Sequence, residues 1–344
     1  MSSCALPDAL CGEKIRRSDF LIDTATFHHR EQTVKTIAQF VRDGIQTTDD
    51  LKAALQVAMQ LEFSTIPPYL CAEWSIDFNN DPDNVMTMIH GVVIQEMYHF
   101  GLAGNILSAI GGTPAIANAS FLPTYPTNTL PGGIHQALPV DLLPLSRGQL
   151  EVFMQIEHPE FNPIALAESP PGTIGAFYST IAAALTSNNP AINTNAPFMK
   201  SGNQVGQIKT IDDALAAIQR IKGEGEGTPQ SPDQPALDGN QLAHYYIFKQ
   251  IHEGKQLINV GGKWDYVGPQ IRFPGVFSFD GSASSPKQAT FNQQLSQLLT
   301  NLQACWTGGS PQPDIGGMSN LQDLGTDLIQ NQVRPPFTWA AVGA

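Results

Sequence analysis

The apolar residues between positions 85 and 110 recur at intervals of three and four, which is the period of a helix with one buried face. Continued through the middle of the segment, this face includes Glu96 and His99, which are three residues apart. The pattern therefore predicts a helix that carries a carboxylate and an imidazole into the protein core. The apolar positions of the face are Val85, Ile89, Val92, Ala103, Ile106 or Leu107, and Ile110.

A carboxylate on a buried face needs a partner, because removing an ionised group from water costs several kcal/mol or more. No Lys or Arg lies between Lys52 and Arg147, so the partner is either a distant Arg or a metal ion. Helix bundles hold carboxylate-bridged metal pairs with Glu-x-x-His on an inward helix face. The alternative is a Glu96–His99 pair that is satisfied inside an ordinary helical core.

A second helix is predicted over residues 49–74, and the apolar face of this segment again includes a carboxylate, Glu62. The Pro67-Pro68 pair follows about one turn later and predicts a kink. Such a kink beside a buried Glu favours local opening for a ligand, although it is also compatible with a simple bend of the bundle.

Carboxylates recur at the ends of two further predicted helices. Residues 146–157 form a short amphipathic segment whose apolar face ends at Glu157. Residues 211–222 form another, which is expected to stop at the glycine-rich run GEGEGT. Glu224 and Glu226 lie in that run, and their negative charge argues against a phosphate site and for a cation. An apolar helix is predicted between the two, over residues 173–185.

A helix is also predicted over residues 241–258, with His244 on its inward face. A single inward His is more often a core residue than a ligand. The other inward Glu and His residues shift the interpretation toward a ligand.

The remaining segments suggest a central bundle with additions at both ends. Residues 1–46 are predicted to form a tail and a short helix, and residues 47–258 the metal-binding bundle. The Pro- and Gly-rich stretch 113–145 is a long crossover loop, with a lid or a pocket wall as its candidate roles. Residues 259–344 are expected to form a loop with a small hairpin and two helices, at 291–306 and 319–331, packed on the bundle.

Composition narrows the classes of partner. The 344 residues carry a formal net charge of −13 and only 14% charged residues, against about 25% in a typical protein. An acidic chain argues against nucleic acid and anionic membrane as partners. No stretch approaches the roughly 18 apolar residues of a membrane span.

Cysteine usage and the N-terminus favour a cytoplasmic protein. The four cysteines, Cys4, Cys11, Cys71 and Cys305, form no Cys-x-x-Cys pair. Cys4 and Cys11 are interpreted as unpaired thiols of a reducing compartment, with a redox pair as the alternative. The first 20 residues lack the apolar core of a signal peptide.

Together the patterns predict an all-α protein, a ferritin-like four-helix bundle with long loop insertions and extra C-terminal helices. Its inward polar residues match the inventory of the di-metal proteins of this fold, although Gln241 stands where a second Glu-x-x-His motif would have its Glu. Oxygen and nitrogen ligands without thiolate suit iron, as one or two ions, or manganese. The candidate ligands are Glu62, Glu96, His99, Glu157, Glu224 or Glu226, and His244.

Four segments of the chain are LQVAMQLEFSTIPPYL, QEMYHFGLAGNILSAIGGTP, GEGEGT and LAHYYIF. Together they resemble the ferritin-like domain of the VioB and RebD family, the iminophenyl-pyruvate dimer synthases. The resemblance covers roughly residues 47–258. Members of that family typically show Gln-Gly-Glu-Gly at the third of these segments, which favours Glu226 over Glu224 as the ligand, whereas helical phase alone slightly favours Glu224.

The resemblance implies an oxidative step in specialised metabolism. The first hypothesis is a non-haem di-iron oxidase or oxygenase that acts with O2 or peroxide on a small, amino-acid-derived substrate. The second is an iron-binding or redox-protective protein without an organic substrate, and the third a non-catalytic bundle whose buried polar groups satisfy one another. A homo-oligomer is compatible with each of them.

Overall fold

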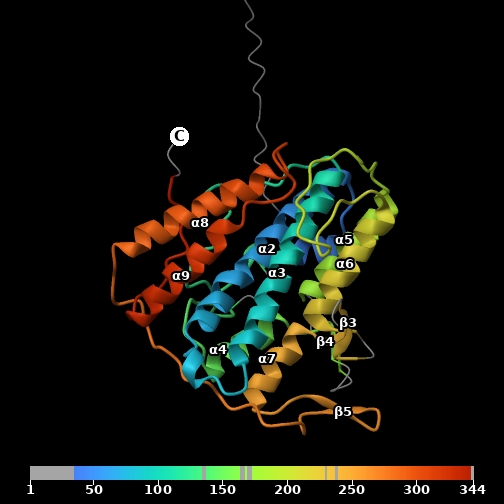
Figure 1. Ribbon diagram of the computed structural model, residues 1–344. Helices are drawn as coiled ribbons and strands as arrows, with labels where there is room; N and C mark the ends of the chain where they lie inside the picture. Colours follow the sequence, from blue (N-terminus) through green and yellow to red (C-terminus); the bar gives the residue numbers. More distant parts are fainter. Residues whose placement is uncertain are drawn as a thin grey trace, which may run out of the picture. The chain divides into compact units, whose positions relative to one another are not determined.

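The structure is a computed structural model that describes residues 35–133, 137–162, 167–168, 173–228, 231–236 and 239–341. Within these residues the protein is helical, with three short hairpins and two single 3-10 turns (Figure 1). The α-helices are α1 (Ile37–Asp43), α2 (Thr48–Trp74), α3 (Val85–Ala109), α4 (Arg147–Ile156), α5 (Ile174–Asn188), α6 (Ile211–Glu226), α7 (His244–Glu253), α8 (Lys287–Ala304) and α9 (Gly316–Gln330). The predicted all-α class is confirmed.

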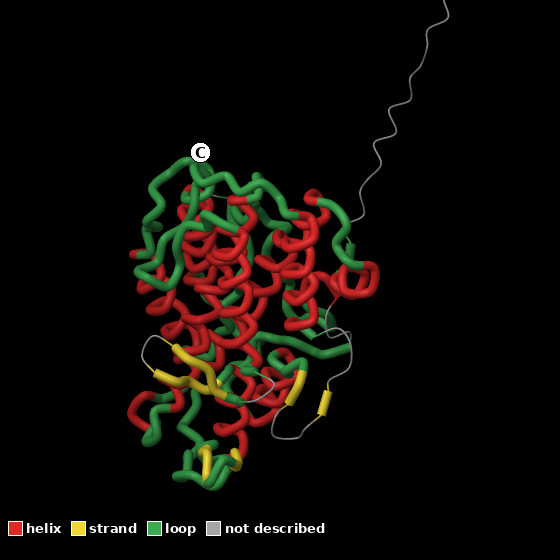
Figure 2. The backbone as a smooth tube through the Cα atoms, turned by 90° about the vertical axis from the view of Figure 1, so that its right-hand side faces the viewer, coloured by secondary structure: helices red, strands yellow, loops and turns green. Residues whose placement is uncertain are grey.

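The strands form three antiparallel two-stranded hairpins, which Figure 2 shows toward one end of the helices. The 3-10 turns are η1 (Phe78–Asn80) and η2 (Pro131–Gly133), and the strands are β1 (Phe161–Asn162), β2 (Ala167–Glu168), β3 (Asp233–Ala236), β4 (Gly239–Leu242), β5 (Ile258–Val260) and β6 (Lys263–Asp265). The β5–β6 pair is the small hairpin that was expected after residue 258.

Helices α2 and α3 pack along each other at the centre of the described structure (Figure 1). Helices α5, α6 and α7 contact this pair on one side, and the α8–α9 pair lies on the other. Every residue of α2 from Leu61 to Trp74 is buried, as expected for a helix that is covered all round. The α2–α3 pair is therefore the layer that can present side chains to both neighbouring layers.

Local sequence signals explain where several helices begin. The hydroxyl oxygens of Thr47, Ser146, Thr173 and Thr210 each accept a hydrogen bond from a backbone N–H in the first turn of the helix that follows. Thr210 and Asp213 form a reciprocal capping box at α6. These caps stabilise the first turns of the helices that carry Glu62, Glu157 and the α6 carboxylates.

The Pro67-Pro68 pair does not end α2, which continues to Trp74. A proline has no N–H to give to the carbonyl four residues earlier, so Pro68 leaves the carbonyl of Ser64 without its helical partner. The hydroxyl of Tyr125 donates a hydrogen bond of 2.6 Å to this oxygen. The crossover loop thus has one clear role, which is to satisfy the proline-interrupted helix.

Two helix boundaries correct the sequence-based prediction. Helix α6 does not stop at the glycine-rich run but continues through Gly223 and Gly225 to Glu226, because both glycines are buried and the glutamates within the run find partners. Helix α7 covers only part of the predicted 241–258 segment. It begins at His244, since Gln241 is paired in β4 with Gln234 of β3, and it ends at Gly254 in the left-handed conformation.

A buried amide joins α3 to two later segments. Asn105 is 1% exposed, and its Nδ2 donates to the carbonyls of Met199 and Gly206, each at 2.8 Å. Its Oδ1 accepts from the N–H of Met199 at 2.8 Å and from the indole of Trp306 at 2.7 Å. The loop before α6 and the segment after α8 are therefore both fastened to one position on α3.

No helix among the described residues has the length and apolar character needed to cross a membrane. Cys71 and Cys305 are buried free thiols. Cys4 and Cys11 lie outside the described residues.

Candidate metal centre

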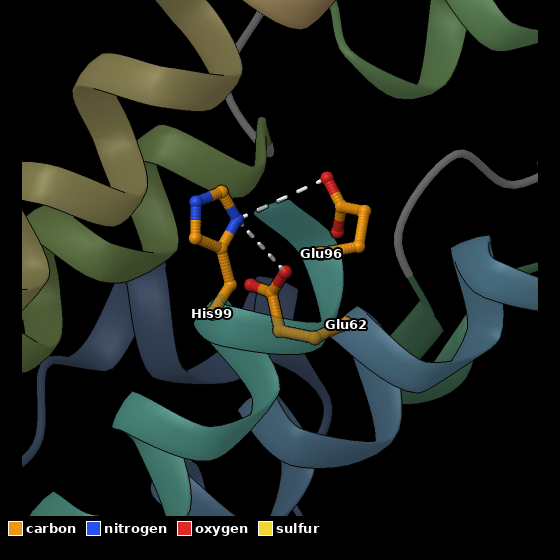
Figure 3. A group of neighbouring side chains, drawn as sticks. All are labelled: Glu62, Glu96 and His99. Atoms are coloured by element: carbon orange, nitrogen blue, oxygen red, sulfur yellow. Dashed lines mark ion pairs between the residues drawn. The ribbon is translucent and has the colours of Figure 1, made fainter. Parts of the chain in front are cut away.

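Glu96 and His99 lie one turn apart on the inward face of α3, and both are buried. The Nδ1 atom of His99 is 3.9 Å from Glu96 Oε1 and 3.6 Å from Oε2 of Glu62, which α2 supplies. Figure 3 shows the three side chains turned toward one another from the two adjoining helices. The helical phase that was visible in the sequence therefore brings these three groups together.

His244 and Glu157 complete a second group around the same carboxylate. His244 is fully buried at the start of α7, and its Nδ1 lies 2.7 Å from Glu96 Oε1 and 3.6 Å from Glu157 Oε2. Glu157 is the residue that ends α4. The rings of His99 and His244 are nearly parallel, with centroids 5.5 Å apart.

The ligand atoms therefore form two groups that could each hold a metal ion, and both groups contain Glu96. One consists of Glu62, Glu96 and His99, and the other of Glu96, Glu157 and His244. A carboxylate shared between two neighbouring groups is the arrangement of carboxylate-bridged di-metal sites in helix bundles.

Each imidazole is oriented by a partner on the ring edge that faces away from the shared carboxylate. The Nε2 atom of His99 is 2.9 Å from Glu224 Oε2, and that of His244 is 2.9 Å from Gln95 Oε1. Metal-bound histidines usually donate their second N–H to such a partner, which fixes the tautomer and the ring orientation. Both rings are thus placed with Nδ1 toward the cluster.

Two tyrosines hold the outer oxygens of the terminal carboxylates. The hydroxyl of Tyr178 on α5 donates to Glu62 Oε1, and the hydroxyl of Tyr69 on α2 donates to Glu157 Oε1. Thr65 donates to the second oxygen of Glu96 at 3.1 Å. Each of the three inner carboxylates therefore has one oxygen fixed by a hydroxyl and the other turned toward an imidazole.

Without a metal ion, protons balance the negative charge of the cluster. Burial and the charges of Glu157 and Glu62 raise the pKa of Glu96 to about 8. Although burial acts to lower the pKa of both imidazoles, the neighbouring carboxylates raise that of His99 to about 10 and that of His244 to about 9. A divalent cation would replace these protons, since metal binding requires neutral imidazole and ionised carboxylate.

Among the described residues, Arg220 is the only arginine that contacts the cluster, and it contacts an outer carboxylate, that of Glu224. Arg220 Nε donates to Glu224 Oε1 at 2.8 Å, from four residues earlier on α6. Burial acts to raise the pKa of Glu224, but His99 and Arg220 lower it to about 2. No Arg or Lys in this part of the chain pairs with Glu96, so the distant-arginine alternative is not what the structure contains.

Glu226 borders the cluster but belongs to neither group. Its two oxygens accept backbone hydrogen bonds from Gly175 at 2.6 Å and from Glu160 at 2.9 Å. The approach to Gly175 is possible only because that residue lacks a side chain, since a Cβ there would lie 2.1 Å from Glu226 Oε1. Burial raises the pKa of Glu226 to about 7.

The surroundings of His244 Nδ1 show whether these residues fit a metal ion. His244 Nδ1 is buried and makes no hydrogen bond, although Glu96 Oε1 is only 2.7 Å away, because the two atoms lack the alignment that a hydrogen bond requires. Buried polar atoms are rarely left without a partner. A nitrogen and an oxygen that lie side by side without a hydrogen bond between them, within a group of three close ligand atoms, fit ligands of one cation, so the residues present suit a metal ion.

The space inside the cluster is small. A cavity of about 20 Å³ lies between the carboxylates, with Tyr178, Gly225 and Glu226 in its wall. About 10–15 Å³ of such volume is enough for one water molecule. The cavity therefore has room for a water molecule or a diatomic molecule, and not for an organic substrate of any size.

These features define the class of protein: a helical bundle in which α2, α3, the end of α4 and the start of α7 contribute two carboxylate–imidazole groups that share one glutamate. The family described as ferritin-like matches residues 55–253, which include all the residues of both groups. The chain belongs to this ferritin-like family.

One solved structure shows the same fold over most of the chain. A ferritin-like protein from Caulobacter vibrioides, known from its crystal structure, has 22% sequence identity and a TM-score of 0.63. The match covers 86% of this chain and 99% of that one. No curated protein matches the sequence.

Several residues around the cluster were not singled out from the sequence. Arg220 could have been identified from the sequence, because a spacing of four residues on a helix places it beside Glu224. Tyr178 and Gln95 could not, because their contacts with Glu62 and His244 join segments more than a hundred residues apart.

Proposed function

We propose that this protein binds two metal ions, iron in the first place and manganese as the alternative, and acts as a non-haem oxidoreductase with dioxygen or peroxide. Glu62, Glu96 and His99 would hold one ion. Glu96, Glu157 and His244 would hold the other. The observation that carries the proposal is that Glu96 belongs to both groups.

The surrounding residues are suited to hold such a centre. When bound here, a pair of iron ions would supply the redox chemistry for the reduction of dioxygen or peroxide. Tyr178 and Tyr69 hold the terminal carboxylates, while Glu224 and Gln95 hold the imidazoles. Ile156, Ile174 and Ile221 line the cavity and exclude bulk water, which strengthens every charge interaction inside.

We place Glu224 in an orienting role and leave Glu226 outside the ligand set. Glu224 is already paired with His99 Nε2 and Arg220, and Glu226 is held by two backbone N–H groups. This choice replaces the Glu226 ligand that the family resemblance favoured.

The proposed reaction is the oxidation of a small organic substrate, in keeping with the resemblance to the VioB and RebD proteins. An amino-acid-derived substrate is the class that this resemblance suggests. A side-chain or loop movement beside the cluster would have to admit it, because the cavity of about 20 Å³ is too small.

A second candidate function is favoured by that same cavity. An iron-binding or redox-protective protein needs to admit only dioxygen or peroxide, which fit the available space. In this case Fe(II) itself is the reductant, and no organic substrate is consumed.

Metal loading followed by oxidation distinguishes these functions. Metal-free protein is titrated with Fe(II) without oxygen, the bound iron is counted, and oxygen uptake is then measured with and without amino-acid-derived substrates. Two irons per chain and a substrate-dependent rise in uptake support the oxidase. Two irons with uptake that no substrate increases support the protective function.

A non-catalytic bundle gives a third result. Protein that binds no iron above the level of a folded Glu96→Gln variant would contradict both candidates. Glu151→Gln, which removes an exposed carboxylate on α4, is the matched control and is expected to keep both irons.

A further inference from the structure

Side chains of the α2–α3 pair and of the α8–α9 pair line a cavity of about 270 Å³. Figure 1 shows the α8–α9 pair on the side of α2 and α3 that is opposite α5 and α6. The cavity is larger than the roughly 150 Å³ that accommodates benzene in an engineered core and a little below the usual size of small-molecule sites. It is separate from the metal cluster, whose own cavity shares none of its lining residues.

The walls of this cavity are almost wholly apolar. Phe63 and Leu70 of α2, Val93 of α3, Leu298 of α8 and Leu321 of α9 all line it. Since Ile315 is 48% exposed and the side chain of His90 is 49% exposed, and both line the cavity, it reaches the surface. A ligand can therefore enter without unfolding the bundle.

One charged group interrupts the apolar wall. Glu73 lines the cavity and is 2% exposed. Its Oε1 pairs with His90 Nδ1 at 2.9 Å, but its Oε2 is buried and has no hydrogen-bond partner among the described residues. Leaving a buried carboxylate oxygen unpaired costs more than leaving a neutral acceptor unpaired.

The charge distribution indicates which ligand would satisfy this oxygen. No Lys or Arg lines the cavity, and Glu73 and His90 are its charged or chargeable side chains apart from the phenol of Tyr98. His90 already serves the other oxygen. A ligand that adds an N–H donor, and above all a positive one, would supply what Oε2 lacks, whereas a ligand carboxylate would be repelled.

We propose that this cavity binds a small apolar molecule that carries a protonated amine, with the amine on the Glu73 carboxylate, whose buried Oε2 turns toward the cavity when the ligand binds, and the apolar part against the α8–α9 side chains. The site lies outside the metal cluster. Its existence does not rest on the function proposed for that cluster.

The test is calorimetric titration of the whole chain with three probes of equal length: n-octylamine, n-octanol and n-octanoate. Octylamine should bind saturably, and more tightly than octanol by about tenfold or more, because a charge-assisted hydrogen bond is gained. Octanoate should bind more weakly than octanol. Binding should be the same in metal-free and metal-loaded protein.

Two variants locate the site. Glu73→Gln keeps an acceptor for His90 and removes the charge, so it should remove the preference for octylamine over octanol. Met318→Trp adds bulk to a half-buried wall position and should weaken binding of both probes. Glu151→Gln on α4 is the control for removal of a carboxylate elsewhere, and thermal unfolding of each variant checks that it is folded.

Equal affinity for octylamine and octanol, or an amine preference that survives Glu73→Gln, would overturn the proposal and leave water as the partner of Oε2. Binding that is unaffected by Met318→Trp would place the probe elsewhere. Absence of iron binding would end the proposed metal function without touching this result.

Discussion

Glu224 holds His99 by the ring edge that faces away from the shared carboxylate, with 2.9 Å between Glu224 Oε2 and His99 Nε2. Arg220 in turn holds the other oxygen of Glu224. The half-buried guanidinium of Arg220 is therefore connected to the buried imidazole of His99 through the Glu224 carboxylate. Such partners fix the orientation of a ligand and raise its basicity without contacting the metal.

The first prediction follows from the contacts that join Arg220, Glu224 and His99. Glu224→Gln should keep the number of bound metal ions but lower the affinity of the His99 group by roughly 10–100-fold, the usual cost of losing such a partner. Competition with a chelator of known affinity measures the change. Glu226→Gln is the matched control and should leave the affinity nearly unchanged, whereas loss of an ion in that variant would restore Glu226 as a ligand.

The second prediction concerns the shared carboxylate. Glu62→Gln and Glu157→Gln should each remove one metal ion, whereas Glu96→Gln should remove both, since it belongs to both groups. Metal analysis of the purified variants gives the counts. An unchanged metal count would contradict the bridging role.

The third prediction is a pH dependence of the metal-free protein. The pKa of Glu96 is about 8 in the folded state against a usual 4.5, so folding takes up a proton there and stability falls as the pH rises through this range. His99 and His244 have pKa values of about 10 and 9, against 6.5 when unfolded. Their stabilisation is complete below pH 6.5 and is lost as the pH rises through 9 and 10.

All three groups therefore act in the same direction. Chelator-treated protein should unfold at a lower urea concentration at about pH 9 than at about pH 6. Bound metal should reduce this difference or reverse it, because it takes the place of the protons. A midpoint that rises with pH in the absence of metal would contradict the charge balance described for the cluster.

The fourth prediction separates the two groups through their tyrosines. Tyr178→Phe should weaken the ion at Glu62 and His99, and Tyr69→Phe the ion at Glu157 and His244, each by about tenfold, because a hydrogen bond to a charged group is lost. Stepwise metal titration resolves the two affinities. Tyr125→Phe, which loses only a bond to a backbone carbonyl of α2, should lower stability without changing either affinity.

The long helices and the polar residues on their buried faces could be predicted from the sequence because local periodicity determines them. In α2 and α3 the apolar face is continuous, so Glu62, Glu96 and His99 could be assigned to the interior from their phase alone. The family match and the structure agree on this bundle.

Helical phase slightly favours Glu224 over Glu226 but could not decide between them. The choice depends on whether α6 continues through Gly223 and Gly225, and the helix does continue because of packing and of the Glu224–His99 contact. Two residues apart on a helix, the two side chains point in different directions, so one reaches His99 and the other the start of α5. The apolar cavity beside Glu73 could not be predicted from the sequence either, because it is formed by helices about two hundred residues apart in sequence.

The four hydrogen bonds of Asn105 have a consequence for any shortened form of the protein. A recombinant fragment cut to the family-matched residues 55–253 would lack Trp306, leaving Oδ1 with one donor fewer and uncovering Gly104, where the indole lies so close that a Cβ would come within 2.5 Å of it. We expect such a fragment to aggregate or to be cleared by proteolysis even though it retains every candidate ligand. The C-terminal segment is thus required for the stability of the bundle, although it carries none of the candidate ligands.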